Sequence, residues 1–294
     1  MAEIAQLDHT VINVQFDMDR AEGLFGDLGF TLTPRGFHSL GSINHLMMFG
    51  TDYLELIGLP PTMENPRKDI AEAPLGINGL VFKSNNVDET FAHIKDLGFD
   101  GDPPKAFTRP VELPDGIEDA AFRTVAVRND VFPGGRVYYC EHRTPELVWR
   151  PEWQSHDNGA SSMPEFVVVS NDYEREASDF AKLLNSDVSG SSGSLAVGYQ
   201  GGQLTLMSPI SYTERYGAAA SPMNGRNSIF GALVLRTDSL DKTRAIRTPT
   251  IDEANRVVLR EENFDSVLEF VKCLEYAPTR LRSSSPPAKL STAP

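Results

Sequence analysis

Two polar side chains stand inside apolar, β-prone segments of the chain. Glu55 lies within the segment Tyr53–Ile57, and His9 is followed by the segment Thr10–Val14. A carboxylate is costly to bury unless a cation or hydrogen-bond donors meet it. One imidazole and one carboxylate on separate strands are suitable ligands for a divalent metal ion if the fold brings them together. The competing interpretations are an ion pair between Glu55 and an arginine, and a hydrogen-bonded core position for His9.

Two further residues accompany the Glu55 strand. Tyr53 lies two residues before Glu55, so both side chains point to the same face of the strand. Asn44 lies on the preceding strand of the same predicted hairpin, whose turn is Phe49–Asp52. Asn44 either lines the site or takes a turn or strand-end role.

A second pair of candidates lies near residue 145. His142 precedes Glu146 by four residues, which places both side chains on one face of an unbulged strand. Pro145 favours a bulge between them. Glu146 is either a metal ligand or part of a structural salt bridge, and His142 is a ligand, an acid or base, or a simple pocket or surface residue.

The composition of the chain limits the partners and the cell compartment that we expect for it. The net charge is -14 and the isoelectric point about 4.9, which argues against a nucleic-acid partner or an anionic membrane surface. Neither a signal peptide nor an apolar run long enough to span a membrane is recognisable, so we expect a cytoplasmic protein. Cys140 and Cys273 lie in apolar segments far apart, which favours reduced, buried thiols.

The chain contains an internal repeat. Leu28–Phe30 recurs as Leu97–Phe99, and the same offset of 69 residues aligns His9 with Asn78. Each copy begins with a strand and an amphipathic helix and continues as strands and turns. A third copy begins at Glu165 and a shorter fourth near Gly231. We therefore predict an α+β fold of paired βαβββ modules in two pairs, each completing a curved sheet.

The predicted organisation has three parts. Residues 5–150 form a module pair with the candidate metal site, residues 160–275 form a degenerate second pair, and residues 280–294 form a disordered tail. A linker covers 150–164. Residues 101–136 contain an insertion with five cations that either forms a lid clamping a substrate carboxylate or phosphate, or a solvated loop. In the second case its cations (Lys105, Arg109, Arg123, Arg128, Arg136) pair with nearby acids (Glu112, Asp115, Glu118, Asp119).

The repeat and its motifs resemble the vicinal oxygen chelate superfamily, and more narrowly its glyoxalase-like branch. The residues that carry this resemblance are Leu7–Val11, Leu28–Phe30, Gly41–Asn44, Tyr53–Ile57 and Cys140–Trp149. The resemblance implies modules that form a U-shaped cup around a divalent metal ion. Members include lyases, isomerases, epimerases, extradiol dioxygenases and antibiotic-resistance proteins, so the fold alone does not fix the reaction.

The resemblance also implies a set of ligands, from the first and last strands of each module. By position these are His9 and Glu55 in the first module, and Asn78 and Glu146 in the second. A neutral asparagine suits Mg²⁺ or Mn²⁺ better than Zn²⁺, and His142 is a substitute ligand. The metal is therefore left open among Zn²⁺, Mn²⁺, Fe²⁺, Ni²⁺ and Mg²⁺. In the second half the corresponding residues are Glu165, Thr205, Phe230 or Gly231, and Glu269, which make a poor site.

From these features we predict a metal-dependent glyoxalase-like enzyme for a small oxygenated metabolite, with isomerase or lyase chemistry favoured over dioxygenase chemistry. The metal would act as a Lewis acid, Glu146 or Glu55 would move the proton, and His142 is the alternative base. Tyr53, Asn78 and Asn44 would contact the substrate. A non-catalytic protein of the same fold that binds or sequesters a small molecule is the alternative. We expect no nucleic-acid or membrane partner and leave a homodimer open.

Overall fold

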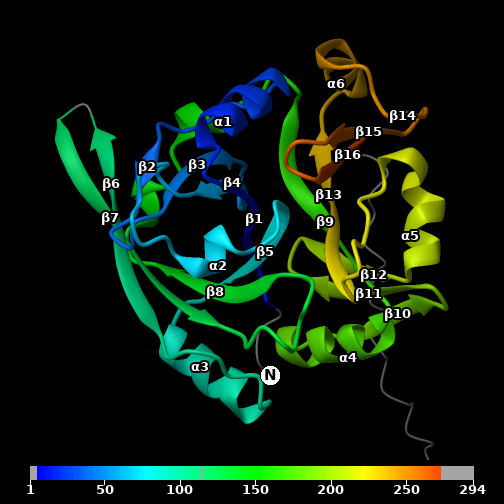
Figure 1. Ribbon diagram of the computed structural model, residues 1–294, viewed down its shortest axis with the longest axis horizontal. Helices are drawn as coiled ribbons and strands as arrows, with labels where there is room; N and C mark the ends of the chain where they lie inside the picture. The colour runs from blue at the N-terminus through cyan, green and yellow to red at the C-terminus, as the bar shows by residue number, and fades with distance from the viewer. Residues whose placement is uncertain (1–4, 114, 273–294) are drawn as a thin grey trace, which may run out of the picture.

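The computed structural model describes residues 5–113 and 115–272, and it contains two curved sheets side by side (Figure 1). The predicted tail and Cys273 lie outside these residues. In spatial order the first sheet consists of β2 (Gly36–Phe37), β3 (Ile43–Met48), β4 (Tyr53–Gly58), β1 (Leu7–Gln15), β5 (Gly76–Lys83), β8 (Arg136–His142), β7 (Gly116–Ala126) and β6 (Lys105–Leu113). Its helices are α1 (Met18–Asp27), α2 (Lys68–Ala71), α3 (Val87–Asp96), η1 (Pro145–Leu147) and η2 (Pro151–Trp153).

The second sheet repeats the order of the first. It consists of β10 (Val188–Ser191), β11 (Ser194–Tyr199), β12 (Gly202–Met207), β9 (Ala160–Ser170), β13 (Ser228–Thr237), β16 (Ser266–Lys272), β15 (Arg256–Glu261) and β14 (Ile251–Asp252). Its helices are α4 (Tyr173–Leu184), α5 (Pro209–Tyr216), η3 (Gly217–Ala219) and α6 (Leu240–Ile246). The third module begins at Ala160, so the predicted linker 150–164 overlaps β9.

Each sheet joins two modules through its central strands. β1 runs antiparallel to β5, while β4 lies parallel to β1 and β8 parallel to β5. β9, β13, β12 and β16 have the same relations in the second sheet. The predicted α+β fold of paired βαβββ modules is confirmed.

The repeated Leu-Gly-Phe segment ends a helix in both modules of the first half. After α1, Gly29 has a φ of 77°, and its N–H and that of Phe30 donate to the carbonyls of Gly26 and Phe25. After α3, Gly98 has a φ of 72° and the same two hydrogen bonds recur, to Lys95 and Ile94. This is the Schellman arrangement, which requires a left-handed residue and therefore favours glycine.

Alternate residues of the central strands belong to different cores. Leu54 and Leu56 of β4 lie in a large cluster that also contains residues of the second sheet and of α1, α3 and α4. Tyr53 and Ile57 face the other way and belong to a separate cluster inside the first sheet. The first sheet therefore has one face in the core shared by both halves, and a second face that curves around an interior, the N-terminal cup.

The insertion folds as a long hairpin rather than a loop. β6 pairs with β7 along its whole length, and the hairpin projects beyond the rest of the first half (Figure 1). Near its base, the N–H of Ser39, just after β2, donates to the carbonyl of Thr108 on β6, with a distance of 2.9 Å. β2 and β6 are the two edges of the sheet, so this contact closes the N-terminal cup on itself.

One predicted strand is wrong. Residues 146–149 do not extend β8, which ends at His142, and Glu146 instead lies in the 3₁₀ helix η1. Pro145 is the first residue of this helix, where its missing N–H costs nothing and its fixed φ suits a helical turn. Within the described residues, no helix is long and apolar enough to cross a membrane.

Candidate functional site

His9 and Glu55 meet on the floor of the N-terminal cup. They come from the parallel strands β1 and β4, and the distance between His9 Nε2 and Glu55 Oε2 is 3.5 Å. Both residues are about 95% buried, with exposed fractions of 4% and 5%. The ring of Tyr53 stacks on that of His9 with a centroid separation of 4.4 Å, and the hydroxyl of Tyr138 lies 3.4 Å from His9 Nε2. The two candidates with the strongest sequence signal are therefore neighbours in a buried, aromatic setting.

Asp8 determines how the imidazole of His9 is presented. Its Oδ1 accepts a hydrogen bond from His9 Nδ1 at 2.6 Å and another from His142 Nε2 at 3.0 Å. Burial alone raises the pKa of Asp8, but the charge and hydrogen bonds of His142 and His9 hold it well below its usual range. With the proton on Nδ1, the neutral imidazole presents the lone pair of Nε2 to Glu55. Two acceptor atoms at this distance need a proton or a metal cation between them.

Asn44 holds the other oxygen of the carboxylate. Its Nδ2 donates to Glu55 Oε1 at 2.7 Å, while its own Oδ1 is buried without a partner. Nearby, His38 lies against Ser42 and Asn44, and burial lowers its pKa to about 4, which keeps its ring neutral at physiological pH. Asn44 thus leaves Oε2 as the oxygen that faces His9.

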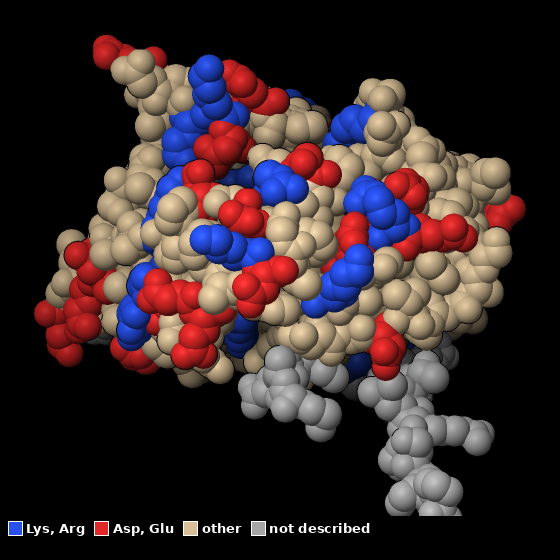
Figure 2. Space-filling view, turned by 90° about the horizontal axis from the view of Figure 1, so that it is seen from below, with Lys and Arg blue, Asp and Glu red and all other residues tan. Residues whose placement is uncertain are grey.

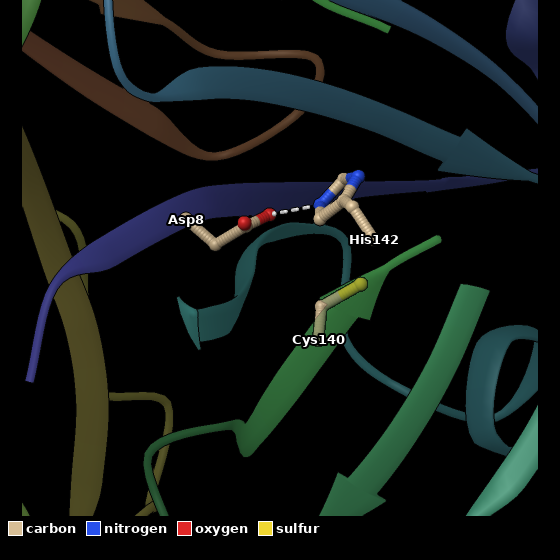
Figure 3. A group of neighbouring side chains, drawn as sticks. All are labelled: Asp8, Cys140 and His142. Atoms are coloured by element: carbon tan, nitrogen blue, oxygen red, sulfur yellow. Dashed lines mark hydrogen bonds and ion pairs between the residues drawn. The ribbon is translucent and has the colours of Figure 1, made fainter. Parts of the chain in front are cut away.

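A second group of donor atoms lies beside this pair. Atoms of Asp8, Cys140 and His142 lie within 4.8 Å of one another, and Figure 3 shows the carboxylate on β1 pointing at the imidazole of His142, with the thiol of Cys140 also on β8. The imidazole Nε2 is already bonded to the carboxylate. Burial raises the pKa of Cys140 well above its usual range, so its thiol stays protonated and is a weak ligand. We regard this group as a support for His9 rather than as the metal centre.

Two predicted site residues lie elsewhere. Asn78 Oδ1 accepts from Arg136 Nε at 3.3 Å, at the irregularity between β1 and β5, and does not line the inner pocket. Glu146 is exposed on η1. The structure therefore brings together His9, Glu55, Tyr53 and Asn44 from the first module, whereas Asn78 of the second module is paired with Arg136 and Glu146 is exposed.

The cup contains two adjoining pockets. An inner pocket of about 40 Å³ is lined by His9, Glu55, Asn44, His38 and Arg109, among others. A wider cavity of about 820 Å³ lies next to it and shares the side chains of His38, Phe107, Thr124 and Tyr138. A concave apolar-walled pocket with a few convergent polar groups is the usual form of a small-molecule site.

Sequence reasoning missed Asp8 and Tyr138, and it did not distinguish Arg109 from the other cations of the insertion. Asp8 directly precedes His9, and a carboxylate beside a candidate ligand is a recognisable sign of an orienting partner. Tyr138 shares strand parity with Cys140 and His142 on β8. Arg109 lies in the insertion, and the local sequence does not show against which part of the fold the insertion packs.

The second half has no comparable open site at the equivalent positions. Arg215 of α5 reaches into its cup, where Nη1 lies 2.6 Å from Glu165 Oε1 and Nη2 lies 2.8 Å from Glu269 Oε2. Tyr216 also donates to Glu269, at 2.7 Å. A guanidinium thus stands between two carboxylates where a cation would otherwise be required.

The sequence matches the family model of the glyoxalase-like domain over residues 7–184. The chain belongs to the glyoxalase-like domain family. This match spans the whole first half and the beginning of the second, and it confirms the resemblance to the vicinal oxygen chelate superfamily. No match was found among curated proteins.

Solved structures share the glyoxalase-like fold over nearly the whole chain. A hypothetical protein from Staphylococcus aureus superposes with a TM-score of 0.65 at 11% identity, covering 92% of this chain and 100% of that one. A mutant 4-hydroxymandelate synthase from Streptomyces coelicolor gives 0.56 at 13% identity, covering 92% and 93%. A fusion of a xylose isomerase-like TIM barrel with 4-hydroxyphenylpyruvate dioxygenase gives 0.57 at 14% identity, covering 92% and 49%. At these identities the likeness establishes the fold and leaves the reaction open.

Proposed function

We propose that the N-terminal cup is the active site of a metal-dependent glyoxalase-like enzyme that acts on a small oxygenated molecule. The observation that carries the proposal is the pairing of His9 Nε2 with Glu55 Oε2 at 3.5 Å. Two ligands each about 2.1 Å from a metal ion are about 3.0–3.4 Å apart in octahedral or tetrahedral geometry. The two donor atoms therefore need almost no rearrangement to share one ion.

The remaining coordination positions would be open. Asn78 is paired with Arg136 and Glu146 lies on η1, while the hydroxyl of Tyr138 lies 3.4 Å from His9 Nε2. A mixed nitrogen and oxygen set suits Zn²⁺, Mn²⁺, Fe²⁺ or Ni²⁺ better than Mg²⁺. When bound, such an ion supplies Lewis-acid polarisation of substrate oxygens.

The chain's own residues would have separate tasks. Asp8 fixes the tautomer of His9, and Asn44 holds Glu55 by one oxygen. Glu55 is the carboxylate that remains available to move a proton, because Glu146 is exposed outside the cup. His142 donates to Asp8 and acts through it rather than as a free base. We favour isomerase or lyase chemistry, and oxygen consumption during turnover would indicate a dioxygenase instead.

The competing function is non-catalytic binding of a small molecule by the same cup. Asn78 turned toward Arg136 and the exposed position of Glu146 favour it, because the second module then contributes no carboxylate or imidazole to a metal site. Metal content distinguishes the two functions.

Reconstitution should give about one equivalent of metal in the wild type. We expect His9→Ala and Glu55→Ala to retain less than about a tenth of this amount, because each removes one of two strong ligands. The measurement is elemental analysis after separate loading with Zn²⁺, Mn²⁺, Fe²⁺, Ni²⁺ and Mg²⁺. Glu146→Ala and Cys140→Ser are the controls and should keep the wild-type content. Equal metal content in all variants, or none in the wild type, contradicts the proposal.

Asp8→Asn should weaken metal binding about 10- to 100-fold while leaving both ligands in place. Carboxylates that accept the second imidazole N–H orient a ligand histidine and raise its basicity, and their loss typically costs this much. The measurement is a competition titration against a chelator. Asp88→Asn, which removes a surface partner of Arg123, is the matched control. An unchanged affinity would show that Asp8 serves folding alone.

A further inference from the structure

Arg109 is a buried cation that no carboxylate of the described residues contacts. It lies on β6, is only 3% exposed, and its Nη2 is buried without a hydrogen-bond partner. Among the described residues no carboxylate lies within ion-pair distance of it. Burial lowers the pKa of this arginine, and Tyr53 and Glu55 are the groups that act against the shift. An uncompensated guanidinium in such a position is destabilising unless a ligand meets it.

The other four cations of the insertion are paired. Lys105 contacts Asp102, Arg123 contacts Asp88, Arg128 contacts Asp130 and Arg136 contacts Asp69. None of these partners is among the acids predicted from the sequence. On the face shown in Figure 2, acidic and basic side chains are likewise interspersed. Arg109 differs from this general pattern of pairing.

The free edge of Arg109 faces the candidate site. It lines the same inner pocket as His9 and Glu55, together with Asn44. Space is kept open here by Gly36 of β2, because a Cβ at this position would lie 2.2 Å from Asn44 Oδ1 and 2.9 Å from Arg109 Nη1. Asn44 Oδ1, which is buried without a partner, thus lies close to Nη1 of Arg109, while the unpartnered donor atom of Arg109 is Nη2.

The approach to this pocket is basic although the protein is acidic. The wider cavity is lined by Arg67, Arg136, Lys105 and Arg128, against only two carboxylates, Asp69 and Asp102. Arg67 and Arg136 share Asp69 as their partner. A cleft with an excess of one charge attracts ligands of the opposite sign.

We propose that the ligand of the N-terminal cup is an organic carboxylate, whose carboxylate group binds Arg109 and whose oxygenated carbon faces His9 and Glu55. A planar carboxylate matches the fork of a guanidinium, and the inner pocket of about 40 Å³ places Arg109 in the same small space as His9 and Glu55. The inference names the substrate class of the proposed function, but it holds equally for a binding protein, since it requires no reaction.

The test is calorimetric titration of the wild type, both metal-depleted and metal-loaded. The probes are lactate and pyruvate, the neutral lactamide, and inorganic phosphate. We expect a carboxylate to bind and lactamide to bind at least about tenfold more weakly, because a hydrogen-bonded charge pair is lost. Arg109→Gln and Arg109→Met should each weaken carboxylate binding about 10- to 100-fold. Arg123→Gln, on the neighbouring strand and outside both cavities, should bind as the wild type does.

Thermal unfolding of the same variants separates ligand binding from a structural role. Arg109→Met should keep or raise the Tm, because it removes a buried charge that has no partner. A marked fall in Tm, carboxylate binding that survives in Arg109→Met, binding of phosphate alone, or no carboxylate binding to the wild type would each overturn the inference. Carboxylate binding by a protein that takes up no metal would leave it standing while contradicting the metal-dependent enzyme.

Discussion

Replacing Arg215 by alanine is expected to lower the free energy of unfolding by about 3–5 kcal/mol, because it breaks a buried ion network by removing one partner. The guanidinium donates to Glu165 and Glu269, which are only 5% and 3% exposed. Arg256 lies 3.7 Å from the other oxygen of Glu269 and offers partial compensation there. The change takes away the two hydrogen bonds that Arg215 donates to Glu165.

Urea unfolding at neutral pH measures this effect. Arg244→Ala, which removes pairs with the exposed carboxylates of Asp241 and Asp252, is the matched control and should cost less than about 1 kcal/mol. Combining Arg215→Met with Glu165→Gln and Glu269→Gln should restore much of the loss, since no buried charge is then left alone. A loss below about 1 kcal/mol in Arg215→Ala would mean that water reaches the two carboxylates.

The two cups differ in whether the buried arginine of each is paired with carboxylates. Both arginines enter a cup from outside its central strands, Arg215 from α5 and Arg109 from the hairpin of β6. Arg215 is bound by two carboxylates, whereas Arg109 keeps an unpartnered Nη2 beside His9 and Glu55. A cup whose charges are satisfied internally has no electrostatic need of a ligand. A cup whose charges are not satisfied internally has such a need, and this difference supports the proposal that the first half binds the ligand.

The fold was predictable because its signals are local and repeated. The Leu-Gly-Phe segments mark two helix ends with a fixed hydrogen-bond pattern, and strand parity places Tyr53 beside Glu55. The meeting of His9 and Glu55 follows from the parallel pairing of β1 and β4, which the module pattern implies. These features depend on short-range geometry and on one repeated unit.

The parts that could not be predicted depend on contacts between distant segments. The position of Glu146 in the repeat predicts a strand, but Pro145 starts a helical turn instead. The composition of the insertion predicts a lid or a loop, while the contact of Ser39 with Thr108 makes the insertion the closing edge of the cup. Arg109 lies on β6 and lines the inner pocket, so its place beside His9 and Glu55 depends on how the hairpin packs.

The buried carboxyl of Asp52 should make stability depend on pH. It lies in the turn before β4 and accepts a hydrogen bond from the N–H of Met163 on β9, at 3.2 Å, so it joins the two halves. Burial raises its pKa from 3.8 to about 7, although the Met163 N–H acts in the opposite direction. Between pH 4 and 7 the folded state holds a proton that the unfolded state has released. Stability therefore falls as pH rises through this window and then levels off.

Asp52→Asn keeps the shape and the acceptor oxygen but cannot ionise, so it should be more stable than the wild type by about 4 kcal/mol at pH 8, and about equal at pH 4. The measurement is the difference in unfolding free energy between the two proteins across this range. The exposed Asp27→Asn should change stability by less than about 0.5 kcal/mol throughout. A constant difference between wild type and Asp52→Asn would mean that folding does not shift the pKa of Asp52 and would contradict the prediction. The turn that positions Glu55 would then carry an ordinary carboxylate, and the junction between the halves would not respond to pH.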